Sequence, residues 1–138
     1  MSTIEDKIRD YFKNEREVLA VYLFGSYAAG KKQHFSDIDI GILLDRDQLS
    51  MGKELRTKYI VELTRILRKD IHPVILNLAS EELLKQIFQK GECILTKDAK
   101  KLARFRMMKF VEIADFDYYR GQMQSGLIRK VMEGRSDG

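Results

Sequence analysis

The segment FGSYAAGKKQHFSDIDIGILL, from Phe24 to Leu44, constrains the fold of this chain more than any other. It begins at the end of an apolar run, VLAVYLF, and closes on a second apolar run, IDIGILL. Both runs are typical of buried strands, and the polar, glycine-containing stretch between them is typical of a loop. The chain therefore carries a Gly-Ser pair at the end of one expected strand and two aspartates at the start of the next.

The two aspartates predict a metal site. Side chains alternate between the faces of a strand, so Asp37 and Asp39 point to the same side. Two neighbouring carboxylates repel each other, which raises the pKa of one of them. A divalent cation neutralises such a pair, and Mg²⁺ or Mn²⁺ suits one or two carboxylates combined with substrate phosphates. The alternative interpretation is a pair of solvated acids at a strand edge.

The Gly25-Ser26 pair and the loop after it suggest a phosphate cradle. Glycine lets the backbone approach an anion closely, and successive N–H groups at a turn or helix start bind phosphate. The Ser26 hydroxyl can donate to a terminal phosphate. Lys31 in the loop can add positive charge, although a loop lysine is commonly just solvated. Gly25, Ser26 and Lys31 are therefore the candidate nucleotide-binding residues.

The rest of the chain alternates between helical and strand patterns. Apolar residues at helical spacing predict helices over 3–14, 51–69, 81–90 and from about 98 onward, and apolar runs predict strands over 18–25, 37–44, 72–78 and 92–96. Pro73 in the third strand indicates a sheet edge or an unpaired N–H at that point. The order α-β-β-α-β-α-β-α predicts an α/β (α+β) fold, a small mixed sheet with helices packed on it.

Composition narrows the class of protein. The 138 residues suggest a single domain over 1–138 with a C-terminal helical extension from about 98. The net charge of +4 mildly favours anionic partners. No apolar run is long enough to span a bilayer and no signal core is present, so we expect a cytoplasmic location and no membrane partner. The single cysteine, Cys93, excludes an intramolecular disulfide or a cysteine zinc site and is expected to pack in a strand.

The stretch GSYAAGKKQHFSDID resembles the G-S-x10-D-x-D signature of the minimal nucleotidyltransferases in the DNA polymerase beta-like superfamily. Gly25, Ser26, Asp37 and Asp39 all fall in place, and the segments HPVILNL and LLKQIFQKGECILTKD also resemble the family. The resemblance implies a nucleotidyltransferase fold, Asp37 and Asp39 as catalytic metal ligands, Mg²⁺ as cofactor (Mn²⁺ possible) and transfer of a nucleoside monophosphate from an NTP.

Members of this size are often antitoxins paired with a HEPN-domain toxin. There the transferase moves AMP from ATP to a tyrosine of the partner and silences an RNase. The chain shows no second domain for a tRNA end or an antibiotic, so the resemblance favours a HEPN toxin as partner and acceptor. It gives no reason to expect direct nucleic-acid binding.

One position departs from the family pattern. Members usually carry a third acid on the strand beside D-x-D, and here His72 falls at that position, with Asp70 two residues earlier on the same face. Three hypotheses stay open: Asp70 substitutes through a register shift, His72 acts as the base, or the site binds nucleotide with little or no turnover. The third would make the chain a binding module that neutralises its partner by contact alone. Transfer to a small molecule or a nucleic acid is a further option.

Overall fold

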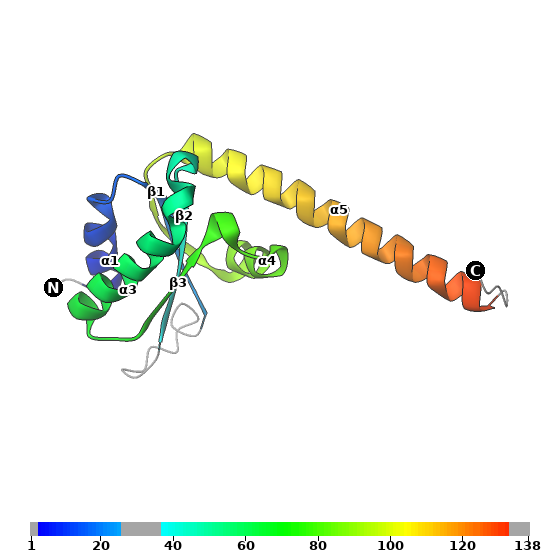
Figure 1. The fold of residues 1–138 in the computed structure, drawn as a ribbon, viewed down its shortest axis with the longest axis horizontal. Helices are drawn as coiled ribbons and strands as arrows, with labels where there is room; N and C mark the ends of the chain where they lie inside the picture. The colour runs from blue at the N-terminus through cyan, green and yellow to red at the C-terminus, as the bar shows by residue number, and fades with distance from the viewer. Residues whose placement is uncertain (1–2, 26–36, 133–138) are drawn as a thin grey trace.

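The computed structural model describes residues 3–25 and 37–132, with side chains up to Gly121 apart from those of Phe116 and Tyr119. Figure 1 shows a small sheet with helices on both faces and one long helix that leaves it. The helices and strands are α1 (Ile4–Lys13), β1 (Val18–Phe24), β2 (Ile38–Leu44), the 3₁₀ helix η1 (Arg46–Met51), α3 (Gly52–Leu67), β3 (Ile71–Ile75), the 3₁₀ helix η2 (Leu76–Leu78), α4 (Glu81–Lys90), β4 (Glu92–Thr96) and α5 (Ala99–Met132).

The four strands form one sheet in the order β3-β2-β1-β4. β1 runs antiparallel to both β2 and β4, whereas β2 and β3 are parallel. The predicted mixed sheet is thereby confirmed. β3 is an edge strand, as Pro73 indicated, because a proline lacks the N–H that a second neighbouring strand would need.

Side-chain alternation divides the core between the two faces of the sheet. On one face α1 and α3 cover β1 and β2. There Phe12 and Tyr59 are fully buried, and their rings pack edge to face with 5.2 Å between the ring centroids. On the other face α4 and the start of α5 cover Tyr22 and Leu43. The central strands are therefore packed between α1 and α3 on one face and α4 and α5 on the other. This packing on both faces fixes where the strands end.

Local sequence signals explain where the helices begin. The Thr3 hydroxyl accepts the Asp6 N–H at 3.1 Å, while the Asp6 carboxylate accepts the Thr3 N–H at 3.2 Å, which is a capping box. The Ser80 hydroxyl caps α4 by accepting the Leu83 N–H. α3 ends two residues before the expected position because Arg68 adopts a left-handed conformation with φ of 55°.

Two expectations about strands were wrong. The predicted strand over 72–78 is shorter at its end, since Asn77 leaves the sheet in η2 and its side-chain amide bonds both the N–H and the C=O of Leu44. Cys93 does lie in β4, but its side chain is exposed rather than packed, whereas that of the next residue, Ile94, is buried.

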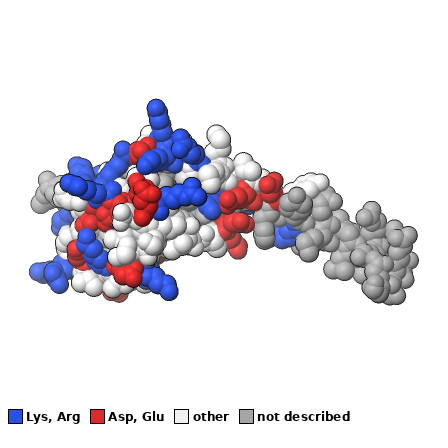
Figure 2. All heavy atoms as spheres, turned by 45° about the horizontal axis from the view of Figure 1, so that its top comes forward, with Lys and Arg blue, Asp and Glu red and all other residues white. Residues whose placement is uncertain are grey.

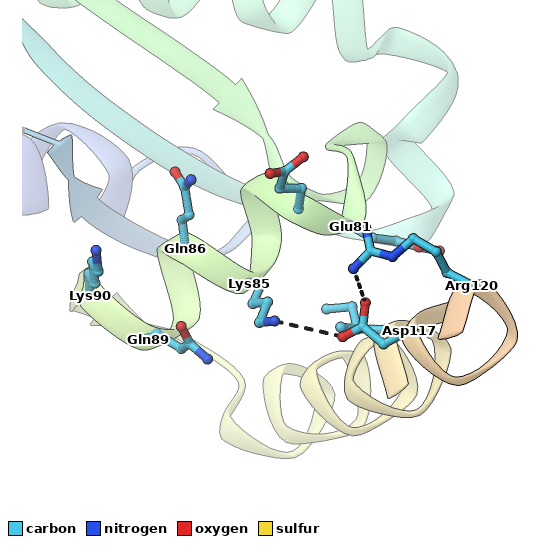
Figure 3. Close-up of a pocket in the computed structure, with 9 residues that line it drawn as sticks. Glu81, Lys85, Gln86, Gln89, Lys90, Asp117 and Arg120 are labelled. Atoms are coloured by element: carbon cyan, nitrogen blue, oxygen red, sulfur yellow. Dashed lines mark hydrogen bonds and ion pairs between the residues drawn. The ribbon is translucent and has the colours of Figure 1, made fainter. Parts of the chain in front are cut away.

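α5 begins on the sheet and then extends away from it (Figure 1). Leu102 and Ile113 are buried where α5 packs on the rest of the chain. Further along, a crevice of about 260 Å³ separates α5 from α4, and there Asp117 pairs with Lys85 at 3.7 Å and with Arg120 at 3.3 Å (Figure 3). Of these two pairs, only Asp117–Lys85 joins α5 to α4, because Arg120 lies on α5 itself. Within the described part of the chain, no helix is long and apolar enough to cross a membrane.

Candidate active site

Asp37 and Asp39 lie where β2 begins, in the middle of the sheet. Asp39 is paired with Phe24 at the end of β1 and with His72 near the start of β3. The end of one strand and the starts of two others therefore meet at one edge. A side chain placed there is anchored by hydrogen-bonded strands on both sides, which suits a site that must hold its geometry.

Gly25 directly follows β1 and lies against the Asp39 carboxylate. Its φ of +76° lies in the left-handed region that side chains disfavour. A Cβ atom built at this position would collide with Asp39 Oδ2. Two independent reasons therefore favour glycine at position 25: the left-handed backbone conformation and the lack of space beside the Asp39 carboxylate.

His72 lies across from Asp39 and contacts Asp37. Its Nε2 atom is 3.1 Å from Asp37 Oδ2, and both side chains are half exposed. The parallel register of β2 and β3 places His72, and not Asp70, opposite Asp39. Of the two candidates His72 and Asp70, His72 is therefore the one that the sheet places next to the two carboxylates.

The pKa of Asp39 is raised above its usual value of 3.8. Partial burial of the carboxylate is the main cause, His72 opposes it when its imidazole is protonated, and the negative charge of Asp37 adds to it. The effect of Asp37 on the pKa of Asp39 indicates that the two carboxylates lie close to each other. A bound cation would offset both the energetic cost of burying the Asp39 carboxylate and its repulsion by Asp37.

Asp70 lies just before β3 and takes part in the sheet through its backbone. Its C=O accepts the Ile38 N–H at 2.9 Å, and its side chain is exposed. Among the described residues, no hydrogen bond or ion pair joins its carboxylate to Asp37 or Asp39. The register shift that would bring Asp70 opposite Asp39 is absent from the β2–β3 pairing as described.

The remaining candidates, Ser26 and Lys31, lie outside the described residues. Among those that are described, no group of three or more His, Cys, Asp or Glu residues is arranged to hold a metal by itself. Two carboxylates beside a glycine fit a hard divalent cation whose other ligands are waters and phosphate oxygens.

Sequence reasoning did not anticipate the contact between Gly25 and Asp39. The motif indicated that the backbone at Gly25 must approach an anion, and the structure places a protein carboxylate there. A local signal was present, because a glycine at the end of an apolar strand often marks a close approach. The identity of the neighbour depends on the pairing of Phe24 with Asp39, 15 residues apart, which no local signal gives.

Solved structures with the same fold come from toxin–antitoxin complexes. A chain of a toxin–antitoxin complex with AMP-PNP is 24% identical, has a TM-score of 0.65 and aligns over 93% of this chain and 98% of its own. A chain of a complex between a tri-AMPylated HEPN toxin of Shewanella oneidensis and an MNT antitoxin is 22% identical, with a TM-score of 0.59 and coverage of 94% and 96%. A chain of an MntA–HepT complex is also 22% identical, with a TM-score of 0.58 and coverage of 94% and 97%.

No curated protein matches this sequence. The likeness to the solved structures, at this level of identity, shows the fold. The family is shown by the sequence itself, since residues 6–100 match the family described as "Polymerase beta, Nucleotidyltransferase". That range is well over half of the chain and contains every candidate site residue discussed above. The resemblance is thereby confirmed: this chain belongs to the polymerase beta-like nucleotidyltransferases.

Proposed function

We propose that this chain transfers AMP from ATP to a tyrosine hydroxyl of a HEPN-domain toxin, and that it thereby acts as the antitoxin. Membership of the nucleotidyltransferase family supports the reaction type. The complexes of similar fold, one with AMP-PNP and one with a tri-AMPylated HEPN toxin, support the nucleotide and the partner. The observation that carries the proposal is the junction of Gly25, Asp39 and His72 at one edge of the sheet.

Asp37 and Asp39 would hold Mg²⁺, or Mn²⁺, on the triphosphate. When bound, such a cation neutralises phosphate charge and makes the α-phosphorus easier to attack. The chain supplies a pair of carboxylates on a rigid strand, one of them with a raised pKa, so that a cation is favoured there. Gly25 leaves the space that the Asp39 carboxylate needs, and Ser26 and Lys31 are proposed to contact the phosphates.

His72 is the better candidate for the base. In the proposed step the acceptor hydroxyl oxygen bonds to the α-phosphorus, the bond to the bridging oxygen breaks and pyrophosphate leaves. The hydroxyl proton passes to His72 Nε2, the atom that contacts Asp37 in the absence of acceptor. Asp70 is the second candidate, with an exposed carboxylate two residues before His72.

One observation favours a second function, a module that binds nucleotide and neutralises its partner by contact alone. A histidine lies opposite Asp39, where the family pattern leads us to expect an acid. Since histidine is a poor ligand for Mg²⁺, one half of the expected metal site would then be missing. This function and the enzymatic one predict different results in a single assay.

The assay combines the chain, α-labelled ATP, Mg²⁺ or Mn²⁺ and the product of the neighbouring gene, tested as the HEPN-domain partner. Label on the partner, lost in Asp39→Asn, is the result expected of the enzyme. Mapping the label to tyrosine would test the acceptor. Neutralisation of the partner without label, unchanged in Asp37→Ala, would instead establish the binding module.

A further inference from the structure

A groove lies at the end of the sheet opposite the aspartates. It has a volume of about 370 Å³ and runs between η1 and the first turns of α5. We call it the distal groove and define it by Leu19, Leu43, Leu49, Arg46, Arg104 and Met108. β2 separates it from the candidate active site, and seven residues of strand span roughly 20 Å. A molecule held in the groove would therefore not overlap a nucleotide at Asp39.

The floor of the distal groove is apolar. Leu43 is buried beneath it, and Leu19 and Leu49 are partly buried at its sides. The one amide in the wall, Asn77, is already satisfied, because it donates to the Leu44 C=O at 3.0 Å and accepts the Leu44 N–H at 2.9 Å. The floor thus offers space for an apolar side chain and leaves few polar groups to bind a ligand.

The rim of the groove is basic, with four cations, Arg46, Lys101, Arg104 and Lys109, and one acid, Asp45. Residues 99–111 of α5 contain five Lys or Arg and no acid, and Figure 2 shows basic side chains gathered where α5 begins. Within the described part of the chain, Lys101 pairs with Asp45 and Lys109 with Glu112, whereas no hydrogen bond or ion pair involves the guanidinium groups of Arg46 and Arg104. Two cations without partners therefore flank an apolar floor.

The apolar surface continues from the groove along α5. Met107, Met108 and Val111 are exposed by 70, 52 and 56%, and Met108 also lines the groove. Scattered exposed apolar residues are ordinary, but three within five residues of one helix, next to an apolar groove, form a continuous surface. Methionine is well suited to such a surface because its flexible side chain adapts to a partner.

We propose that the distal groove docks an acidic segment of the partner toxin, with an apolar side chain of that segment seated on the leucine floor. This inference rests on the toxin partner proposed above. Charge complementarity favours an acidic segment as the occupant, because carboxylates can pair with Arg46 and Arg104 while an apolar side chain can pack on the floor. A nucleic acid would use the cations but not the floor, so an acidic peptide fits the whole surface better.

Docking away from the active site has a functional consequence. A partner held at the distal groove would be retained while its acceptor hydroxyl enters and leaves the other end of the sheet. Loss of the groove should therefore raise the partner concentration needed for half-maximal transfer and leave the maximal rate nearly unchanged. Nucleotide binding should not change.

The test measures affinity for the purified toxin, carried in an RNase-inactive form, by calorimetry. The double variant Arg46→Glu with Arg104→Glu should weaken binding about tenfold or more. The control is the double variant Lys7→Glu with Arg65→Glu, which makes the same charge change on exposed residues of α1 and α3. This control should change the affinity less than about twofold. Met108→Asp should also weaken binding, and Val61→Asp, on a residue 50% exposed in α3, should not. A fluorescent ATP analogue should bind all four variants equally.

The possible failures are distinguishable. If the toxin binds and is labelled but both groove variants bind it like wild type, the docking site is wrong and the proposed function stands. If wild type does not bind the toxin at all, the proposed function fails and the docking proposal fails with it. If the Arg variant loses only binding of a labelled 20-nucleotide RNA, or only a self-association seen by light scattering, the groove serves a nucleic acid or a second copy instead.

Discussion

Asp39 and Asp45 lie at opposite ends of β2, and their surroundings shift the pKa values of the two carboxylates in opposite directions. The Asp45 carboxylate accepts the Asp47 N–H at 3.2 Å and lies 3.4 Å from Lys101 Nζ. These contacts, the Asp47 N–H first, lower the pKa of Asp45 below 3.8, whereas burial and the charge of Asp37 raise the pKa of Asp39. Asp45 thus stabilises the fold, whereas the fold disfavours the charged form of Asp39. The two ends of one strand treat the same chemical group in opposite ways, and the disfavoured acid is the one at the candidate site.

Substitutions of Asp39 and Asp45 should differ most in their effect on the rate of AMP transfer. Asp39→Asn should lower the rate of AMP transfer by about 10³-fold or more, because charge that stabilises the transition state is removed from the site. Asp45→Ala should leave the rate within about twofold of wild type. The measurement is the initial rate of label transfer to the partner at saturating ATP. Equal rates in the two variants would contradict the contrast drawn between the two ends of β2.

His72 tests whether catalysis at this end of the sheet depends on more than the carboxylates. His72→Gln keeps a polar side chain but cannot take the proton, so transfer should fall about 10²-fold while binding of the ATP analogue is retained. Asp70→Asn is the matched control in the same segment. If instead Asp70→Asn abolishes transfer and His72→Gln does not, the base is Asp70.

Gly25 tests whether the close contact with Asp39 matters. Gly25→Ala places a Cβ against the carboxylate at a left-handed φ, so it should displace Asp39, reduce transfer about 10²-fold and destabilise the fold by about 1–2 kcal/mol. Gly121→Ala is the matched control, because a Cβ there meets nothing within 4 Å. In a helix that control should stabilise by about 0.5–1 kcal/mol. A Gly25 variant with normal activity would show that Asp39 tolerates displacement.

The smallest expected effects concern stability, and they have opposite signs. Asp45→Ala should destabilise by about 0.5–1 kcal/mol at pH 7, since it removes a helix cap. Asp39→Asn should raise Tm at pH 7 without divalent cations, since it removes a carboxylate whose ionisation the fold disfavours. Thermal unfolding in EDTA measures both.

The pH dependence follows from the two pKa shifts. The lowered pKa of Asp45 gives a contribution that is present above pH 3.8 and lost as the pH falls through its pKa in the folded state. The raised pKa of Asp39 gives a destabilisation that is absent below pH 3.8 and sets in as the pH rises through its folded pKa. Both differences from wild type should therefore shrink towards pH 3. A Tm difference for either variant that grows on acidification would contradict these assignments.

Local patterns predicted much of this molecule. The edge position of Pro73 and the placement of both aspartates at the start of a strand are confirmed. Each depends on a few neighbouring residues, through apolar spacing and the missing N–H of proline. The 3₁₀ turn at Asn77 was missed because its side chain bonds Leu44, 33 residues earlier.

The sequence by itself determined the elements, their order and the nucleotidyltransferase family, because apolar spacing and a compact motif are local properties of the chain. Tertiary structure alone decided which residues meet at the site. Parallel pairing of β2 with β3 brings His72 opposite Asp39, and antiparallel pairing of β1 with β2 brings Gly25 against the same carboxylate. Strand register is set by burial of whole strands between two layers of helices, so it is a property of the assembled core.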